Sequence, residues 1–223
     1  LHGQVSRGMF QQLWPGFDVA DVPITSITNG VHGPTWRDPR FQSMALEYMT
    51  PLQDADGEFW LRTSEQGGVP SGVIWAKRRE LRVNLVESAR QRMKESWLER
   101  GASPAEIGWA DTILDPDVLT IGFARRVPTY KRLTLMLSGP ERLVRLLTDP
   151  DRPIQLVIAG KSHPDDEQGV SLIQRLVQFS DDPRVRDRIA FLPNYDMGLA
   201  HVLVPGCDVW LNNPLRPLEA SGT

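Results

Sequence analysis

The chain has 223 residues, of which 40% are hydrophobic and 24% charged, with a formal net charge of -3. This composition lacks the basic bias typical of nucleic-acid-binding proteins, so any anion site must be local. A single cysteine excludes an internal disulfide, and no apolar run reaches the roughly 20 residues that a membrane span needs. We therefore expect a cytoplasmic setting. Neither end reads as a natural terminus or a signal peptide, so we expect a fragment.

The first half of the chain is irregular, with loop-forming stretches at 34–39 and 67–72. Its clearest element is a long helix from about residue 74 to 100, which Gly101 should end. Its arginines lie mostly off the apolar stripe and predict a solvated outer face rather than a glucan-binding surface. The stripe itself recurs every four residues and comprises Leu81, Leu85, Ala89, Met93 and Trp97.

From about residue 118, short apolar runs alternate with amphipathic stretches, the pattern of an α/β, Rossmann-like parallel sheet flanked by helices. We predict two parts: a mixed loop and helical segment at 1–117 that packs on the C-terminal domain, and a truncated Rossmann-like domain at 118–223. Ligands of such sheets bind beyond the carboxyl ends of the strands. Strands are expected at 118–123, 154–159, 189–192 and 208–211, and helices at 130–147, 169–179 and 197–204.

A cluster of cations follows the first of these strands. Arg125, Arg126, Lys131 and Arg132 fall where that strand ends and the next helix is expected to begin. A helix N-terminus already favours negative charge, so cations placed there predict a site for one or more phosphate groups. The alternative is a plain surface patch.

The last residues of the chain form a small-residue turn after the final predicted strand. Glu219 can accept hydrogen bonds from two sugar hydroxyls, while the backbone amides beside small residues can hold hydroxyls or phosphate oxygens. The alternative is an ordinary strand-to-helix turn. Its position after a strand should bring this turn to the same sheet edge as the cations. The small residues are Ala220, Ser221, Gly222 and Thr223.

A third segment, near the N-terminus, contains the turn dipeptide Asn29-Gly30 followed by His32 and Trp36. Each has a structural alternative: a turn for Asn29, a satisfied structural histidine for His32 and core packing for Trp36. Elsewhere, we expect Asp165, Asp166 and Glu167 to be helix-start carboxylates, Cys207 a small buried hydrophobe and His163 part of a loop. No metal site is predicted.

Taken in chain order, these segments resemble the C-terminal half of the glycogen, starch and maltodextrin phosphorylases, whose C-terminal domain is of the GT-B glycosyltransferase type. The resemblance covers nearly the whole chain. The matching motifs are Thr28, Asn29 and Gly30 with Trp36 at the family's spacing; Arg126 with Tyr130, Lys131 and Arg132; Gly160 with Lys161; Asn194 with Tyr195; and Glu219 to Thr223.

The resemblance implies a pyridoxal-phosphate-dependent enzyme that releases glucose 1-phosphate from α-1,4-glucan with inorganic phosphate. It implies that the cofactor acts through its own phosphate, as an acid toward the substrate phosphate. Two phosphate dianions need cations between them, which the resemblance assigns to Arg126 and Lys131 as catalytic residues. It places Trp36, Arg125, Tyr195 and Thr223 at the cofactor, and Asn29, Glu219, Ala220, Ser221 and Gly222 at the glucosyl ring.

Departures from the family pattern, such as Pro128 and Thr129 before the Tyr-Lys pair, indicate a divergent bacterial branch. The cofactor lysine of the family is expected beyond Thr223, so the isolated chain is expected to be inactive and its parent an active homodimer. No nucleic-acid or membrane partner is expected. The alternatives are a nucleotide-sugar glycosyltransferase resembling glycogen synthase and a non-catalytic glucan-binding remnant.

Overall fold

A computed structural model describes residues 2–27, 30–48, 50–53, 59–62, 69–127, 131–163 and 165–215. The chain divides into two compact units. One comprises residues 1–33 and 216–223, and the other comprises 34–215. The domain boundary that the sequence suggests near residue 118 stays a prediction.

The first unit begins with helix α1 (His2–Phe10), which continues into the short 3-10 helix η1 (Gln11–Leu13). The loop that follows folds back on α1, where Arg7 donates to the carbonyl of Ile24 at 3.2 Å. Ser26 lies so close to Gly3 that a Cβ there would be 2.7 Å from its hydroxyl oxygen. Only glycine fits this position.

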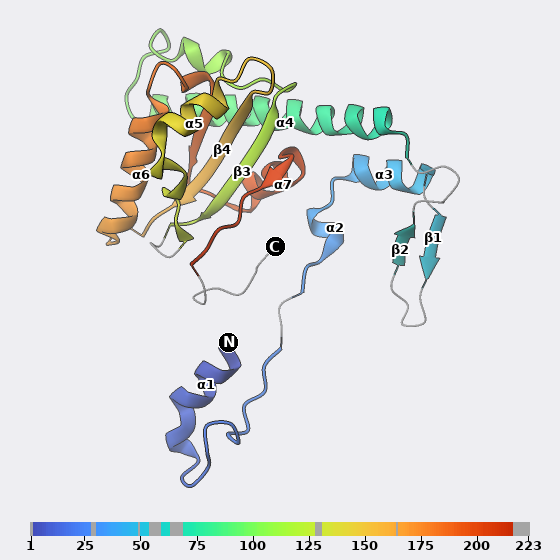
Figure 1. The fold of residues 1–223 in the computed structure, drawn as a ribbon, viewed down its shortest axis with the longest axis vertical. Helices are drawn as coiled ribbons and strands as arrows, with labels where there is room; N and C mark the ends of the chain where they lie inside the picture. The colour runs from blue at the N-terminus through green and yellow to red at the C-terminus, as the bar shows by residue number, and fades with distance from the viewer. Residues whose placement is uncertain are drawn as a thin grey trace. The chain divides into compact units, whose positions relative to one another are not determined.

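The second unit is built on a four-stranded parallel sheet with the order β5-β4-β3-β6 (Figure 1). This confirms the predicted α/β class. The strands read as continuous apolar runs because both faces of a parallel sheet are covered. They are β3 (Leu119–Arg126), β4 (Ile154–Lys161), β5 (Ile189–Pro193) and β6 (Val209–Trp210).

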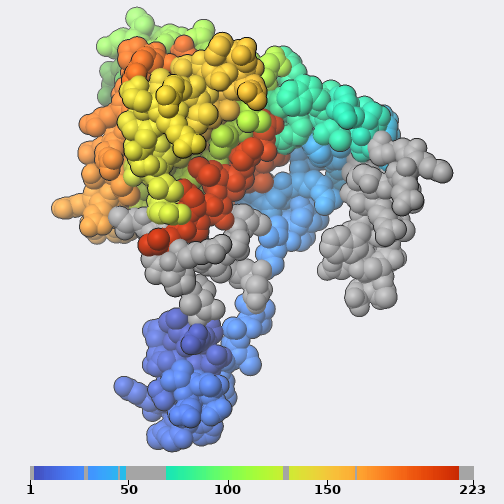
Figure 2. All heavy atoms as spheres, in the orientation of Figure 1, coloured from blue at the N-terminus to red at the C-terminus, as the bar shows by residue number. Residues whose placement is uncertain are grey.

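Two pairs of helices cover the sheet. On one face, α4 (Ser71–Glu99) and α7 (Met197–Gly206) pack over small strand residues such as Ala124 and Ala159. On the other, α5 (Pro140–Leu147) and α6 (Glu167–Ser180) pack over larger ones such as Phe123 and Ile158. The space-filling view shows the second unit from the side on which α5 lies (Figure 2).

The helix ends follow local chemistry. Asp166 caps α6 by accepting from the amide of Gly169 at 2.9 Å, as predicted for a helix-start carboxylate. Asp196 caps α7 in the same way through the amide of Leu199 at 2.7 Å. After α4, Gly101 adopts a φ of +92°, which L side chains rarely tolerate, so it ends the helix as predicted.

The remaining elements lie mostly before α4 or in connections. In the described part of the chain, no helix is long and apolar enough to cross a membrane. The elements are α2 (Gly33–Trp36), α3 (Pro39–Tyr48), a hairpin of β1 (Thr50–Gln53) and β2 (Phe59–Arg62), and the 3-10 helices η2 (Gly108–Asp111), η4 (Leu135–Ser138) and η5 (Arg186–Arg188).

The prediction of one helix across 130–147 is wrong. Within its described part, Lys131 to Ser138 forms turns and the short η4, and α5 begins only at Pro140. Proline has no amide hydrogen and fits the first turn of a helix but not its interior, so Pro140 starts a helix here. Lys131 and Arg132 therefore do not lie at a helix N-terminus.

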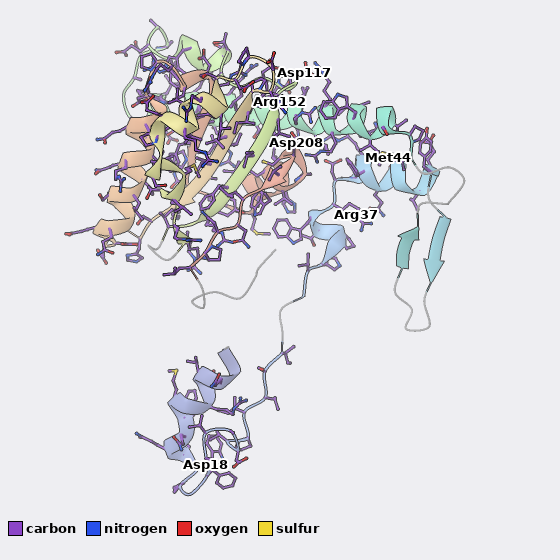
Figure 3. The ribbon with its side chains drawn as sticks, in the orientation of Figure 1. Asp18, Arg37, Met44, Asp117, Arg152 and Asp208 are labelled. Atoms are coloured by element: carbon purple, nitrogen blue, oxygen red, sulfur yellow. The ribbon has the colours of Figure 1, made fainter. Side chains whose placement is uncertain are left out.

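The prediction that the arginines of α4 form a solvated outer face is also wrong. Arg82 is fully buried, and its guanidinium donates to Asp208 at 2.8 Å and to the carbonyl of Pro116 at 2.7 Å. Arg78 donates to Asp208 as well, at 3.1 Å. Arg90 donates to the carbonyls of residues 113 and 114. Arg78 and Arg82 thereby attach α4 to Asp208, which directly precedes β6 and is labelled in Figure 3.

Cys207 is 6% exposed, as predicted for a small buried hydrophobe. Burial raises the pKa of its thiol to about 12, with a further contribution from the Asp208 carboxylate. Near pH 8, only about one thiol in 10⁴ is then ionised, against about one in four in an unfolded chain. We expect alkylation by iodoacetamide, followed by peptide mass spectrometry, to be slow in the folded protein and rapid in urea. Equal rates would contradict this assignment.

Candidate active site

Two cations lie side by side at the carboxyl edge of the sheet. Arg126 ends β3 and Lys161 ends β4, and the two residues are partners in the strand register. They are on the sheet face that α4 and α7 cover, because Ala124 and Ala159 precede them by two positions. Both are exposed, and no carboxylate among the described residues pairs with either. Like charges directly opposite each other are unfavourable, so this pair is suited to an anion.

The pair Gly160-Lys161 matches a motif of the family, but the sequence alone assigns no function to Lys161. The signal that could have found it is the register of two predicted strands, which brings their last residues together. At Gly160, just before it, a Cβ would lie 3.0 Å from the methyl group of Val127, so a side chain there would require Val127 to shift. Val127 then closes the ladder through its amide, which donates to the carbonyl of Lys161 at 3.2 Å.

The other predicted cations have different surroundings. Arg125 and Arg132 are half-buried and reach the segment that follows β6. Arg125 donates from Nη2 to the side-chain oxygen of Asn212, and Arg132 donates from Nε to the carbonyl of Asn213 at 2.7 Å. Lys131 is also half-buried. The small-residue turn expected at this edge lies outside the described residues, so its place stays a prediction; the residues described just before it, 212–214, accept hydrogen bonds from Arg125 and Arg132.

Tyr195 follows β5 at the same edge and packs, half-buried, against the core under α4 and α7. Burial, and then the neighbouring Asp196 carboxylate, raise the pKa of its phenol. The hydroxyl therefore stays protonated at neutral pH and can act as a hydrogen-bond donor. The residue before it, Asn194, adopts a φ of +56°, which turns the chain sharply out of the strand.

Trp36 is half-buried and stacks on His201 of α7, with ring centroids 5.4 Å apart and an angle of 26° between the planes. Its partner is a surface histidine rather than the core, which argues against plain core packing. Sequence reasoning missed His201, because a single histidine on a helix carries no pattern that could predict such a stack.

The remaining predicted site residues lie outside the described residues. They are Asn29, Glu219, Ala220, Ser221, Gly222 and Thr223. Where the chain is described, no group of His, Cys, Asp and Glu residues could hold a metal ion. His163 lies in a loop, where its ring accepts from the amide of Asp165 at 3.2 Å.

The fold and the site together define a parallel α/β domain with cations from two neighbouring strands at its carboxyl edge. Comparison with known proteins then shows which proteins the chain is similar to. The chain is 58% identical over all 223 residues to the glycogen phosphorylase of Mycobacterium tuberculosis (strain ATCC 25618 / H37Rv), of which it covers 26%. It is 40% identical over 226 residues to the glycogen phosphorylase of Aquifex aeolicus, covering 32% of that protein.

A third relative is the maltodextrin phosphorylase of Thermococcus litoralis, 35% identical over 232 residues and covered to 26%. In each of these comparisons the whole of the present chain is matched. No protein-family model matches the chain. Over its whole length the chain is similar to glycogen and maltodextrin phosphorylases, and it spans about a quarter to a third of the length of these relatives.

Proposed function

We propose that the protein is a pyridoxal-phosphate-dependent α-1,4-glucan phosphorylase, which transfers a glucosyl unit from glycogen or maltodextrin to inorganic phosphate. This chain would supply the cofactor side of the active site. The observation that carries the proposal is the pairing of Arg126 with Lys161 at the carboxyl edge of the sheet. The identity to phosphorylases over the full chain supports it.

In this proposal, Arg126 and Lys131 act on the substrate phosphate. Lys161 joins them because it is the register partner of Arg126. The planar guanidinium of Arg126 can donate two parallel hydrogen bonds to one phosphate, which fixes its orientation, while a lysine acts as a point charge. Residues proposed to face the cofactor are Trp36, Arg125, Tyr195 and Thr223, and those proposed to face the glucosyl ring are Asn29, Glu219, Ala220, Ser221 and Gly222.

The residues at this edge fit the phosphate group of the cofactor. Arg126 and Lys161 are exposed cations with no carboxylate partner in the described part of the chain. The cofactor, when bound, supplies a phosphate that can protonate the substrate phosphate. The resemblance places its attachment lysine at a position that none of the chain's lysines matches, so we propose that it lies in a part of the full-length protein that this chain does not span.

The role of the protein side chains is electrostatic. Two negatively charged phosphate groups repel each other, and Arg126, Lys131 and Lys161 would offset that repulsion so that the two groups can approach each other. Positive charge developing on the glucosyl ring is then balanced by the phosphate held at Arg126. Groups oriented in advance toward developing charge commonly form the largest single contribution to catalysis.

The test uses the full-length protein that contains this sequence. Incubated with maltodextrin and phosphate, it should release glucose 1-phosphate and show the absorbance of bound pyridoxal phosphate, whereas the 223-residue chain alone should release none. Transfer of glucose from a nucleotide sugar instead would indicate a glycogen-synthase-like enzyme. Glucan binding without turnover or colour would indicate a non-catalytic protein. Either result would overturn the proposal.

We further propose that the full-length enzyme is a cytoplasmic homodimer and that residues 118–223 belong to its C-terminal domain, preceded by the mixed loop and helical segment 1–117. The contacts of α4 with β5 and α7 support packing on that domain for residues 71–99. Light scattering on the purified enzyme would test the dimer.

A further inference from the structure

Arg132 belongs to the predicted phosphate cluster, yet its guanidinium is occupied by protein. Its Nε donates to the carbonyl of Asn213 at 2.7 Å, and its Nη2 donates to the carbonyl of Pro214 at 3.5 Å. We infer that Arg132 is a positioning residue, which holds the segment after β6 by donating to backbone carbonyls and does not bind an anion. The inference rests on the proposed function, because that segment leads toward the residues proposed to face the glucosyl ring.

The segment needs such support because β6 is very short. Only Val209 and Trp210 form the strand, and they pair with Ile121 and Gly122 of β3. One more bond, from the amide of Leu211 to the carbonyl of Gly122 at 2.8 Å, extends the contact.

Beyond Leu211, the segment is held by arginine side chains and no longer by backbone hydrogen bonds to β3. Arg125, at the end of β3, donates to the side chain of Asn212, and Arg132 donates to the carbonyls of Asn213 and Pro214. Three consecutive residues are thus held by two arginines that flank the undescribed 128–130. We define Asn212, Asn213 and Pro214 as the clamped segment.

The backbone at Arg132 is specialised for this contact. Its φ is +51°, in the left-handed region that residues other than glycine rarely occupy. Such a conformation persists only where its surroundings enforce it. Here Leu133 is fully buried on one side, and the amide of Leu135 donates to the carbonyl of Arg132 at 3.0 Å.

Arg126 provides the contrast within the same motif. It is exposed and has no carboxylate partner among the residues that the structure describes, so it suits a ligand. Arg132 is half-buried and donates to a backbone carbonyl, so it is suited to a structural role. The two arginines should therefore respond differently to the loss of charge.

Substituting Arg132 by glutamine or by lysine distinguishes a structural hydrogen-bond donor from an anion-binding residue. The amide nitrogen of glutamine stands three carbons beyond Cα, as does the Nε of arginine, so Arg132→Gln can still donate to the carbonyl of Asn213 without charge. Arg132→Lys keeps the charge but places its donor nitrogen one atom beyond the position of Nε, and Arg132→Ala removes both the charge and the donor. Small displacements of binding groups can cost about 10²-fold in rate. Arg142→Gln, an exposed change on α5, is the control.

In the full-length enzyme we expect kcat to fall about 30-fold to 100-fold in Arg132→Ala and in Arg132→Lys, with the KM for phosphate nearly unchanged. Arg132→Gln should stay within about threefold of wild type, as should Arg142→Gln. Good activity in the lysine variant with poor activity in the glutamine variant would assign Arg132 to the anion and overturn the inference. Unchanged activity in the alanine variant, or loss in all three, would also overturn it.

Hydrogen exchange provides a readout that does not depend on activity. The amides of Leu211, Asn212, Asn213 and Leu215 should exchange at least about tenfold faster in Arg132→Ala than in wild type, since the clamp limits local opening, and should be little changed in Arg132→Gln. Equal exchange in wild type and the alanine variant would refute the clamp. A wild-type protein that releases no glucose 1-phosphate but shows the expected exchange pattern would refute only the proposed function.

Discussion

Replacing Arg126 by glutamine in the full-length enzyme should lower kcat/KM for phosphorolysis by about 10²-fold, equivalent to about 3 kcal/mol of transition-state stabilisation. The reason is that glutamine removes both the charge and the two-pronged donor, while the exposed position of Arg126 leaves the fold intact. The loss should include a raised KM for phosphate, because the side chain is assigned to the substrate anion. Initial rates measured over a range of phosphate concentrations provide the test.

Two further variants make this result specific. Arg126→Lys keeps the charge and should recover part of the activity, and Lys161→Gln should weaken phosphate binding because Lys161 is the register partner of Arg126. Arg142→Gln again serves as the neutral control. Wild-type kinetics in Arg126→Gln would remove Arg126 from the active site.

Replacing Asp208 by alanine should destabilise the protein by about 3–5 kcal/mol, as expected when one partner of a buried ion pair is removed. Asp208 accepts from Arg82 at 2.8 Å, from Arg78 at 3.1 Å and, through its other oxygen, from the amide of Thr120 at 2.9 Å. Arg82 has no solvent exposure, so its charge would be left buried without a carboxylate. Urea unfolding of the full-length protein, followed by tryptophan fluorescence, measures the loss.

The same helix offers a matched control. Arg79 of α4 pairs with Asp117 at 2.6 Å, but both side chains are about half exposed, at 49% and 57% (Figure 3). Solvent screens exposed pairs, so Asp117→Ala should have only a small effect on stability. A similar effect of the two aspartate substitutions would mean that the Asp208 network does not hold α4 against the sheet.

Much of the second unit could be predicted from its sequence. The strand at 154–159 and the helices at 169–179 and 197–204 match β4, α6 and α7 to within two residues at each end. They were predictable because strands buried on both faces give unbroken apolar runs, and because Asp166 and Asp196 mark helix starts. The strand at 118–123 was too short by three residues, since β3 continues through its two arginines to Arg126.

The two wrong predictions arose where a proline or a contact distant in sequence outweighed the local sequence pattern. At 130–147 the apolar spacing suggested one helix, but Pro140 can only begin a helix. On α4 the mixed charges suggested a solvated face, whereas Arg82 meets Asp208, 126 residues away. Periodicity within a helix carries no information about a carboxylate so distant in sequence, so a buried arginine could not be distinguished from an exposed one.

The sequence predicted where the candidate site lies, but not how its side chains are arranged. The rule that ligands bind at the carboxyl ends of strands located the correct edge. Which of its cations remain available could not be read from the motif, because this depends on the segment after β6, which engages Arg125 and Arg132. The stack of Trp36 on His201 likewise depends on a tertiary contact.

The most direct test of the central claim is a crystal structure of the full-length enzyme with pyridoxal phosphate and inorganic phosphate bound. Phosphate oxygens should lie about 3 Å from the guanidinium of Arg126, with Lys161 or Lys131 completing the site. Arg132 should remain on the carbonyls of Asn213 and Pro214. Phosphate bound elsewhere, with Arg126 facing solvent, would contradict the account.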